Sequence, residues 1–380
     1  MKLYKKLIGI LILFVLIIGN YCVVYAGNYS AIATMSRSQE IPGCVQNFDV
    51  FKFSSGTAYM MTSRSANEII HLELGKLNKS TGEFEKVGKR VKTISDHEIP
   101  GHGDSVEVLE HEGEYYYVFV NGQGKEINSI GCSKLNLTLD SKGEISEWEL
   151  TDSTTTYLSL FPTYNSAPIS NCLIASSENY ICIATAYGDT IKTDTERYHI
   201  YKKKEFITRL SEKNYNQSNF NDIRMGTGMF KTGSLGFNVS KTDTVIQSIE
   251  LDEISNNPDT VIIFGAIDNR STREEHQINR VYLHFTPADP LTAQDLSKNK
   301  CYYSQVTDLV DGDKTIPMNF TSTISNRFEL EGLKKVYGLS NAGIQNGWYV
   351  SVNSTQYKND IENPWNFNIY RATTTPVTNY

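Results

Sequence analysis

The chain has 380 residues, a formal net charge of −7, and 39% hydrophobic residues. Because a net negative charge gives no electrostatic attraction to a phosphate backbone, we do not expect nucleic acid as a partner. The length is ample for a large core. The 23 tyrosines and 16 phenylalanines are typical of β structure and also of surfaces that bind carbohydrate.

The N-terminus has the pattern of an export signal. Three lysines in the first six residues precede the apolar run 7–18, and small residues follow at 24–26. The apolar run is too short to cross a bilayer of ~30 Å as a permanent helix. We therefore expect cleavage between Ala26 and Gly27, which leaves residues 27–380 as one secreted domain without a stable membrane anchor.

One β pattern recurs five times along the chain. In the clearest copy, the polar segment 101–105 leads into a strand at 106–109, and after a tight turn the apolar strand 115–120 pairs back. Turn-forming residues separate strands that are rich in β-branched and aromatic residues, which predicts hairpins. The five predicted hairpin units are 48–64, 101–120, 171–184, 245–264 and 328–352.

Further strand signals follow the hairpins. Third strands are predicted at 70–74, 134–139, 198–201, 280–285 and 366–370. Outer strands are predicted at 87–94, 145–150, 206–210 and 302–307. The last unit has no room for its own outer strand, so we expect residues 31–35 to supply it and to cover an open sheet edge.

These units predict an all-β, five-bladed β-propeller-like repeat whose ring is closed by the N-terminal strand, because a lone unit cannot cover both its faces. Long loops are expected at 212–236 and 287–300, and the main helix signal is at 291–296. A β-sandwich with extra strands is the alternative. It does not explain why the polar lead-in recurs at the same place in each unit.

In a propeller the first strand of each unit lines the central channel, so the polar residues of these strands are the candidate site. His102, Asp104 and Glu107 are the catalytic candidates. Candidate binding residues come from the other units: Asn171, Gln247, Glu250, Glu329 and Glu331. Converging carboxylates can act as acid and base on a glycosidic bond or hold a cation. The alternative is that these groups only tie the inner ends of the units together by hydrogen bonds.

Other residue types add little chemistry. No cysteine pair has zinc-ligand spacing and no phosphate-binding or nucleophile motif occurs, so we assign no metal and identify no cofactor. Cys172 and Cys182 either face each other across one hairpin or are separate buried thiols. Trp148, Trp348 and Trp365 are predicted to pack in the core rather than to stack on sugars.

Gly101-His102 with Glu107, followed by the strand at 115–122, resembles a segment of the helveticin J-like proteins, which are class III bacteriocins. Residues 245–266 and 329–370 are similar to later units of that family in the same order. At Ser170-Asn171 the chain departs from the family, which tends to carry a histidine and a glutamate in this unit. The resemblance implies a secreted antibacterial protein that binds a cell-wall glycan or surface receptor of related Gram-positive bacteria. It supplies no known catalytic residue.

Three functions therefore stay open. The resemblance favours a bacteriocin that acts on the cell envelope. The second is a secreted propeller glycoside hydrolase that acts on extracellular polysaccharide, and the third is a non-enzymatic module that binds a glycan or a surface. The sequence leaves open whether the protein is an enzyme.

Overall fold

The structure of the protein is a computed structural model. It describes residues 27–36, 44–66, 69–78, 84–88, 91–94, 106–121, 129–150, 156–159, 169–187, 196–211, 224–230, 244–254, 257–269, 276–285, 303–307, 318–320, 328–336, 338–339, 347–354 and 366–372. The predicted signal peptide, His102, Asp104 and the helix expected at 291–296 lie outside these ranges.

The described strands form five sheets, each named here by its first strand. The β2 sheet contains β2 (Cys44–Lys52), β3 (Ala58–Ala66), β4 (Ile69–Leu77), β5 (Phe84–Lys86) and β6 (Val91–Ile94). The β7 sheet contains β7 (Glu107–His111), β8 (Glu114–Asn121), β9 (Ser129–Leu139), β10 (Ile145–Leu150) and β11 (Thr156–Ser159).

The other three sheets follow the same plan of consecutive antiparallel strands. The β12 sheet contains β12 (Ile169–Ser176), β13 (Tyr180–Tyr187), β14 (Glu196–Lys202) and β15 (Arg224–Phe230). The β16 sheet contains β16 (Thr244–Ile254), β17 (Asn257–Asn269), β18 (His276–Phe285) and β19 (Tyr303–Thr307). The β21 sheet contains β21 (Phe328–Val336), β22 (Gly347–Ser354), β23 (Asn366–Ala372), β1 (Gly27–Ser36) and β20 (Met318–Phe320).

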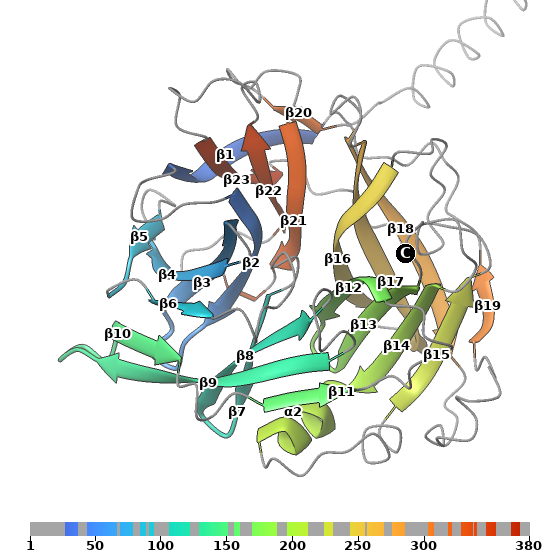
Figure 1. The fold of residues 1–380 in the computed structure, drawn as a ribbon, viewed down its shortest axis with the longest axis horizontal. Helices are drawn as coiled ribbons and strands as arrows, with labels where there is room; N and C mark the ends of the chain where they lie inside the picture. Colours follow the sequence, from blue (N-terminus) through green and yellow to red (C-terminus); the bar gives the residue numbers. More distant parts are fainter. Residues whose placement is uncertain are drawn as a thin grey trace, which may run out of the picture.

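The first strands of the five sheets contact one another in a closed cycle. β2 contacts β7, β7 contacts β12, β12 contacts β16, β16 contacts β21, and β21 contacts β2. Figure 1 shows the sheets following one another around a common centre. The all-β prediction is confirmed, and the described strands form five sheets rather than the two of a sandwich.

The N-terminal strand completes the last sheet, as expected. β1 pairs antiparallel with β23, with Ala31 opposite Tyr370, and its first residues pair in parallel with β20. The chain thus brings strands from both its ends into one sheet, where β1 covers the edge that β23 would otherwise expose.

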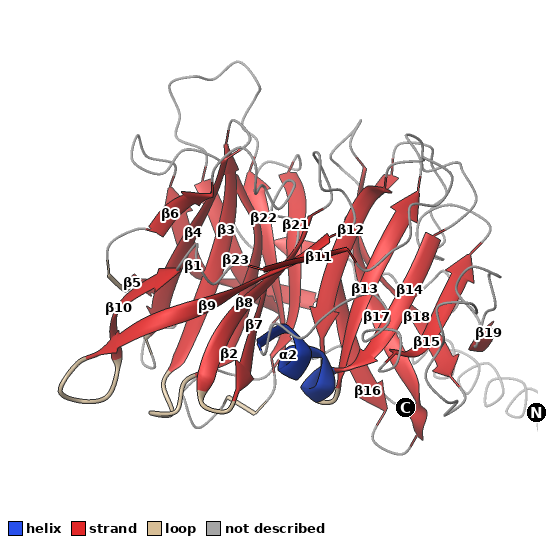
Figure 2. Cartoon of the chain, turned by 60° about the horizontal axis from the view of Figure 1, so that its bottom comes forward, coloured by secondary structure: helices blue, strands red, loops and turns tan. Residues whose placement is uncertain are grey.

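The outer strand predicted at 206–210 is wrong. These residues belong to α2 (Lys203–Ser211), in which Phe206, Ile207 and Leu210 are buried. This spacing of apolar residues places them on one helical face. α2 packs against β7, β9, β13 and β14 at one end of the strands (Figure 2). The outer strand of this sheet is β15, which lies inside the loop predicted at 212–236.

Two further boundaries differ from the prediction. Of the outer strand expected at 87–94, only β6 is a described strand, and β5 lies before it. Gly88 lies between β5 and β6 with a φ of +67°, a conformation that breaks a strand. The turn expected around 256–259 is shorter, because β17 already begins at Asn257. Within the described ranges, no helix has the length and apolarity that a bilayer crossing requires.

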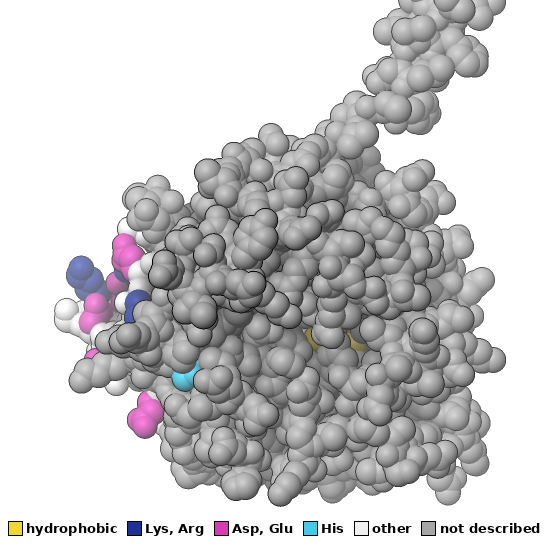
Figure 3. Space-filling view, turned by 45° about the horizontal axis from the view of Figure 1, so that its top comes forward, with side chains coloured by type: hydrophobic (Ala, Val, Ile, Leu, Met, Phe, Trp, Pro, Cys, Tyr) yellow, Lys and Arg dark blue, Asp and Glu magenta, His cyan; other side chains and the backbone are white. Residues whose placement is uncertain are grey.

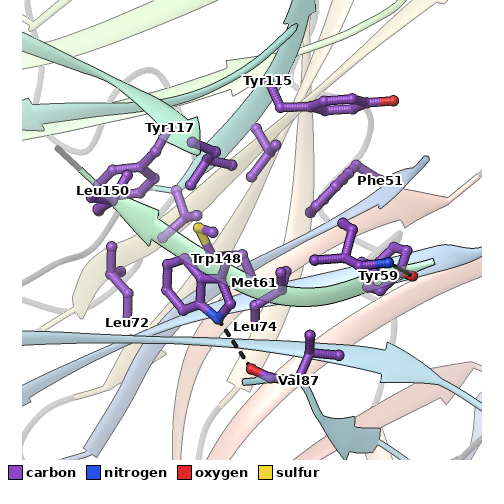
Figure 4. Close-up of a cluster of buried hydrophobic side chains, with 14 of the residues drawn as sticks. Phe51, Tyr59, Met61, Leu72, Leu74, Val87, Tyr115, Tyr117, Trp148 and Leu150 are labelled. Atoms are coloured by element: carbon purple, nitrogen blue, oxygen red, sulfur yellow. Dashed lines mark hydrogen bonds between the residues drawn. The ribbon is translucent and has the colours of Figure 1, made fainter. Parts of the chain in front are cut away.

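A large apolar core joins the β2 and β7 sheets (Figure 4). Phe51 and Tyr59 from the first sheet pack with Tyr115 and Tyr117 from the second, and Trp148 donates a hydrogen bond from Nε1 to the carbonyl of Val87 at 3.1 Å. Trp148 is therefore a core residue, as predicted. This packing fixes the relative position of β2 and β7, which both carry acidic residues at the centre.

Candidate functional site at the centre of the five sheets

Three carboxylates and one ammonium group meet where the first strands converge. Lys334 on β21 places Nζ 3.4 Å from Oδ1 of Asp49 on β2 and 3.5 Å from Oε2 of Glu250 on β16. It also donates a hydrogen bond to Oε1 of Glu107 on β7. All four residues are buried, with 7% or less of each exposed. We call these four residues the central cluster.

β-bulges occur in three of the four strands that carry the cluster. The register shifts between Val45 and Asn47 in β2, between Ile246 and Ser248 in β16, and between Leu330 and Leu333 in β21. A bulge changes the direction in which the following side chains point, and bulges are common beside functional sites. Each of these bulges lies within a few residues of its cluster residue.

Both oxygens of Asp49 accept hydrogen bonds from backbone amides. Oδ1 accepts from the N–H of Val50 at 2.7 Å, and Oδ2 accepts from the N–H of Val108 at 2.7 Å. The second bond crosses from the β2 sheet to the β7 sheet. Together with Lys334, these donors hold the carboxylate in a fixed orientation as an acceptor.

Glu107 is bound from two sides. Its Oε2 accepts a hydrogen bond from Oγ of Ser176 at 2.5 Å, and its Oε1 accepts from Lys334. Burial raises the pKa of Glu107, and attraction to Lys334 opposes that shift. Ser176 in turn accepts from Nζ of Lys203 at 3.3 Å. Burial lowers the pKa of Lys203, the first residue of α2.

Glu250 has one carboxyl oxygen that accepts no hydrogen bond. Within the part of the chain that the structure describes, its buried Oε2 has no hydrogen-bond partner and lies 3.5 Å from the Lys334 ammonium, while the backbone N–H of Lys335 donates to the carboxyl group. Burial raises the pKa of Glu250 well above its usual value, despite the opposing attraction of Lys334. Burial therefore favours the protonated form of Glu250 more strongly than that of Glu107.

Lys334 remains charged at the centre of these acids. Burial alone would lower its pKa, but attraction to Asp49, Glu107 and Glu250 outweighs burial and holds the pKa well above the usual lysine value. The cluster thus combines a permanent cation, a carboxylate held by amides, and a carboxyl group that favours its protonated form.

A hydroxyl and amide network supports the strand that carries Lys334. Oγ of Ser248 accepts hydrogen bonds from Nδ2 of Asn47 and from the N–H of Leu333, both at 3.3 Å. Oγ of Ser351 accepts from the N–H of Gly332 at 2.6 Å. A Cβ at Gly332 would lie 2.7 Å from Oγ of Ser351 and 2.9 Å from Oδ1 of Asn47. Glycine therefore allows β21 to approach β2 closely.

The structure brings together two of the residues predicted from the sequence, Glu107 and Glu250. Glu331 is buried on β21, three residues before Lys334, and Gln247 is half-buried on β16. Glu329 lies on β21 and Asn171 on β12, but their side chains are outside the description, as are His102 and Asp104. The links between Asp49 and Val108 and between Glu107 and Ser176 also tie neighbouring sheets together, as the alternative interpretation expects.

Sequence reasoning missed Asp49 and Lys334. Asp49 interrupts the otherwise apolar run around Phe48 and Val50, and a single acidic residue in a first strand was the available signal. Lys334 had no comparable signal. Among the described residues, no group of three His, Cys, Asp or Glu side chains is placed to hold a metal ion. The exposed charges visible in Figure 3 lie to one side of the molecule, near β5 and β10, and are separate from the cluster.

No protein-family model and no curated protein sequence matches the chain. Solved structures do match it. An α-L-arabinofuranosidase from Podospora anserina, solved with cellotriose, is 6% identical, with 93% of this chain and 98% of the enzyme covered and a TM-score of 0.45. An α-L-arabinofuranosidase from Lactobacillus brevis is 9% identical, with 86% and 90% covered and a TM-score of 0.44. An endo-arabinase from Bacteroides thetaiotaomicron is 11% identical, with 87% and 95% covered and a TM-score of 0.39.

These findings correct the bacteriocin expectation. The similar structures named above are glycoside hydrolases, and none of them is a bacteriocin. The expected class of bacteriocin is therefore corrected, and a receptor on target bacteria gains no support from these structures. Of the three functions that the sequence leaves open, the glycoside hydrolase is the one that the names of these structures share.

Proposed function

We propose that the protein is a secreted five-bladed β-propeller glycoside hydrolase that acts on extracellular polysaccharide. The cyclic contacts of the five first strands support the propeller, and β1 in the last sheet supports a ring closed by the N-terminal strand. The export signal expected in residues 1–26 supports secretion, and an extracellular glycan is the partner that fits this location.

The convergence of acids with different environments is the observation that carries the proposal. Glycosidases use one protonated carboxyl group as general acid and a second, ionised carboxylate as base or nucleophile. Burial favours the protonated form of Glu250, whereas Asp49 accepts two amide hydrogen bonds. We assign the general acid to Glu250 and the base or nucleophile to Asp49, since contrasting environments separate the two roles.

The two acids lie close to the same nitrogen. Oδ1 of Asp49 and Oε2 of Glu250 each lie within 3.5 Å of the same Lys334 nitrogen, so they are separated by no more than twice that distance. Carboxyl groups about 5–5.5 Å apart retain the anomeric configuration, and groups about 6.5–9.5 Å apart invert it. Glu107 accompanies the pair as a third acid that binds Lys334.

Purified protein that begins at Gly27 tests the proposal on a panel of plant and microbial polysaccharides. We expect new reducing ends on at least one glycan, and Glu250→Gln and Asp49→Asn should each lower the rate about 10²–10⁴-fold. Glu149→Gln is the matched control because Glu149 is exposed on β10, away from the cluster. A wild-type protein that cleaves nothing, or a Glu250→Gln variant that is fully active, contradicts the proposal.

A second candidate is a non-enzymatic module that binds glycans, in which the cluster only joins the sheets. Deep burial favours it, because the exposed fractions of Asp49, Glu107 and Glu250 are 4%, 1% and 2%. Binding of a glycan without cleavage, unchanged in Glu250→Gln, would support this candidate. A loss of cleavage with retained glycan binding in the same variant would support the hydrolase.

A further inference from the structure

Lys334 is the only described residue that contacts all three acids of the central cluster. Its ammonium bonds to Glu107 and lies 3.4 Å from Asp49 and 3.5 Å from Glu250. Its neighbour Lys335 instead pairs with Asp252. The two consecutive lysines of β21 thus pair with different acids, and only Lys334 belongs to the central cluster.

We infer that Lys334 is a positioning residue that holds Asp49 and Glu250 around one nitrogen and sets the upper end of the pH range in which Glu250 serves as general acid. This inference rests on the proposed glycoside hydrolase function. Lys334 takes no part in bond cleavage itself. It acts through the two carboxyl groups, by fixing their separation around one nitrogen and by stabilising their charged forms.

The charges that face Lys334 come from every element around it. Asp49 faces it from β2, Glu107 from β7 and Glu250 from β16. Lys203 at the start of α2 is the other cation, and it reaches Glu107 through the hydroxyl of Ser176. With both lysines charged and all three acids ionised, the site would carry one excess negative charge. A single proton on Glu250 balances it.

Loss of the Lys334 charge should move the basic limb of the activity profile to higher pH. A nearby cation favours the ionised form of a carboxyl group, and its removal raises the pKa by about 1–3 units. The acid Glu250 would therefore keep its proton to a higher pH on the basic limb.

The test compares pH profiles of kcat/KM for the wild type, Lys334→Met, Lys334→Arg and Lys335→Met on a cleaved glycan. We expect Lys334→Met to shift the basic limb upward by about 1–3 pH units. Lys334→Arg, which keeps the charge, should stay near the wild-type profile. Lys335→Met is the matched control and should leave the basic limb in place. A folded Lys334→Met variant with an unshifted basic limb overturns the inference, because a merely structural lysine would lower activity at every pH alike.

If Lys334→Met does not fold, a measurement on the wild-type protein tests the inference about Lys334 instead. The ¹⁵N NMR signal of the Lys334 side chain should remain that of an ammonium at about pH 10.4, where a free lysine is half deprotonated. Carboxyl ¹³C signals should show Glu250 protonated at neutral pH. The inference is overturned if Lys334 is a neutral amine at about pH 10.4. It is also overturned if Glu250 is ionised at neutral pH.

The two proposals fail in different ways. If the wild type cleaves no glycan, the hydrolase proposal fails, while the NMR titration still shows whether Lys334 controls the acids. If the wild type cleaves a glycan but its pH limits are independent of Lys334, only the inference about Lys334 fails.

Discussion

Glu250 is the residue of the central cluster in which burial and charge conflict most strongly. Its buried Oε2 lies 3.5 Å from an ammonium but accepts no hydrogen bond within the described ranges, and the backbone N–H of Lys335 is the donor to this carboxyl group. Removing a carboxylate from water costs several kcal/mol unless it is paired and hydrogen-bonded. Burial accordingly raises the pKa of Glu250 and so favours the protonated state, which is also the state that a general acid requires.

This conflict predicts a pH-dependent stability. An unfolded glutamate titrates near pH 4.3, and burial raises the pKa of Glu250 well above this value in the folded protein. Between the two pKa values the folded state binds more protons, so its free energy of unfolding falls as the pH rises. Glu107, whose pKa burial also raises, adds to the effect.

We expect the decrease in the free energy of unfolding between about pH 5 and 7 to be smaller in Glu250→Gln than in the wild type. The glutamine stays neutral and cannot titrate. Urea denaturation at several pH values measures the decrease, and Glu149→Gln should behave like the wild type. If the free energy of unfolding of the wild type and of Glu250→Gln falls equally with pH, this carboxyl group titrates alike in the folded and unfolded states, which contradicts the prediction.

At the scale of elements, α2 takes a place where the sequence pattern suggested an outer strand. One face of α2 is buried, and it carries Phe206, Ile207 and Leu210. The ring centroid of Phe206 lies 5.3 Å from that of Tyr201 on β14. The helix begins at Lys203, whose Nζ donates to Ser176 beside Glu107. Packing of α2 is therefore linked to the support of the central cluster.

Leu210→Ala should lower the free energy of unfolding by about 2–5 kcal/mol, because it removes a buried side chain and leaves a cavity. Lys204→Ala on the exposed face of α2 is the control and should change it by less than about 0.5 kcal/mol. Chemical denaturation of both variants provides the comparison. If the two variants are equally stable, α2 does not pack as described.

At the scale of the whole molecule, β1 is the strand on which the last sheet depends. It pairs with β23 from Tyr29–Ala372 to Ser36–Asn366 and also with β20. Without β1, a row of unpaired amides and carbonyls on β23 would be left as an open sheet edge, which favours aggregation.

A chain that begins at residue 37 should therefore unfold at a lower temperature than a chain that begins at Gly27, and it should aggregate more readily. Thermal unfolding followed by circular dichroism, together with light scattering, measures both effects. Identical melting temperatures and scattering for the two chains would mean that β1 contributes nothing to the last sheet.

Much of the fold could be predicted because its signals are local. Alternating apolar residues and turn formers mark hairpins such as β7–β8, where Glu112 and Gly113 both have positive φ, at 55° and 82°. The segment 206–210 misled the prediction because a short apolar run fits a strand or a helix equally well. The helical spacing of Phe206 and Leu210 becomes clear only when it is known which side chains of the segment are buried.

The site was harder to predict because its contacts join distant parts of the chain. Lys334 and Glu107 are 227 residues apart in the sequence, and no local pattern at either residue indicates the other. Glu107 and Glu250 could be selected as polar residues of first strands. Asp49 and Lys334 become candidates only when the first strands are placed around a common centre.

Mass spectrometry of products formed in H₂¹⁸O tests most directly whether the central acids hydrolyse glycosidic bonds. The wild-type protein should release oligosaccharides that carry one ¹⁸O at each new reducing end, since water supplies the oxygen in either stereochemical course. Glu250→Gln should release about 10²–10⁴-fold less. Labelled products in equal amounts from both proteins, or no labelled products from the wild type on any glycan, would contradict the account.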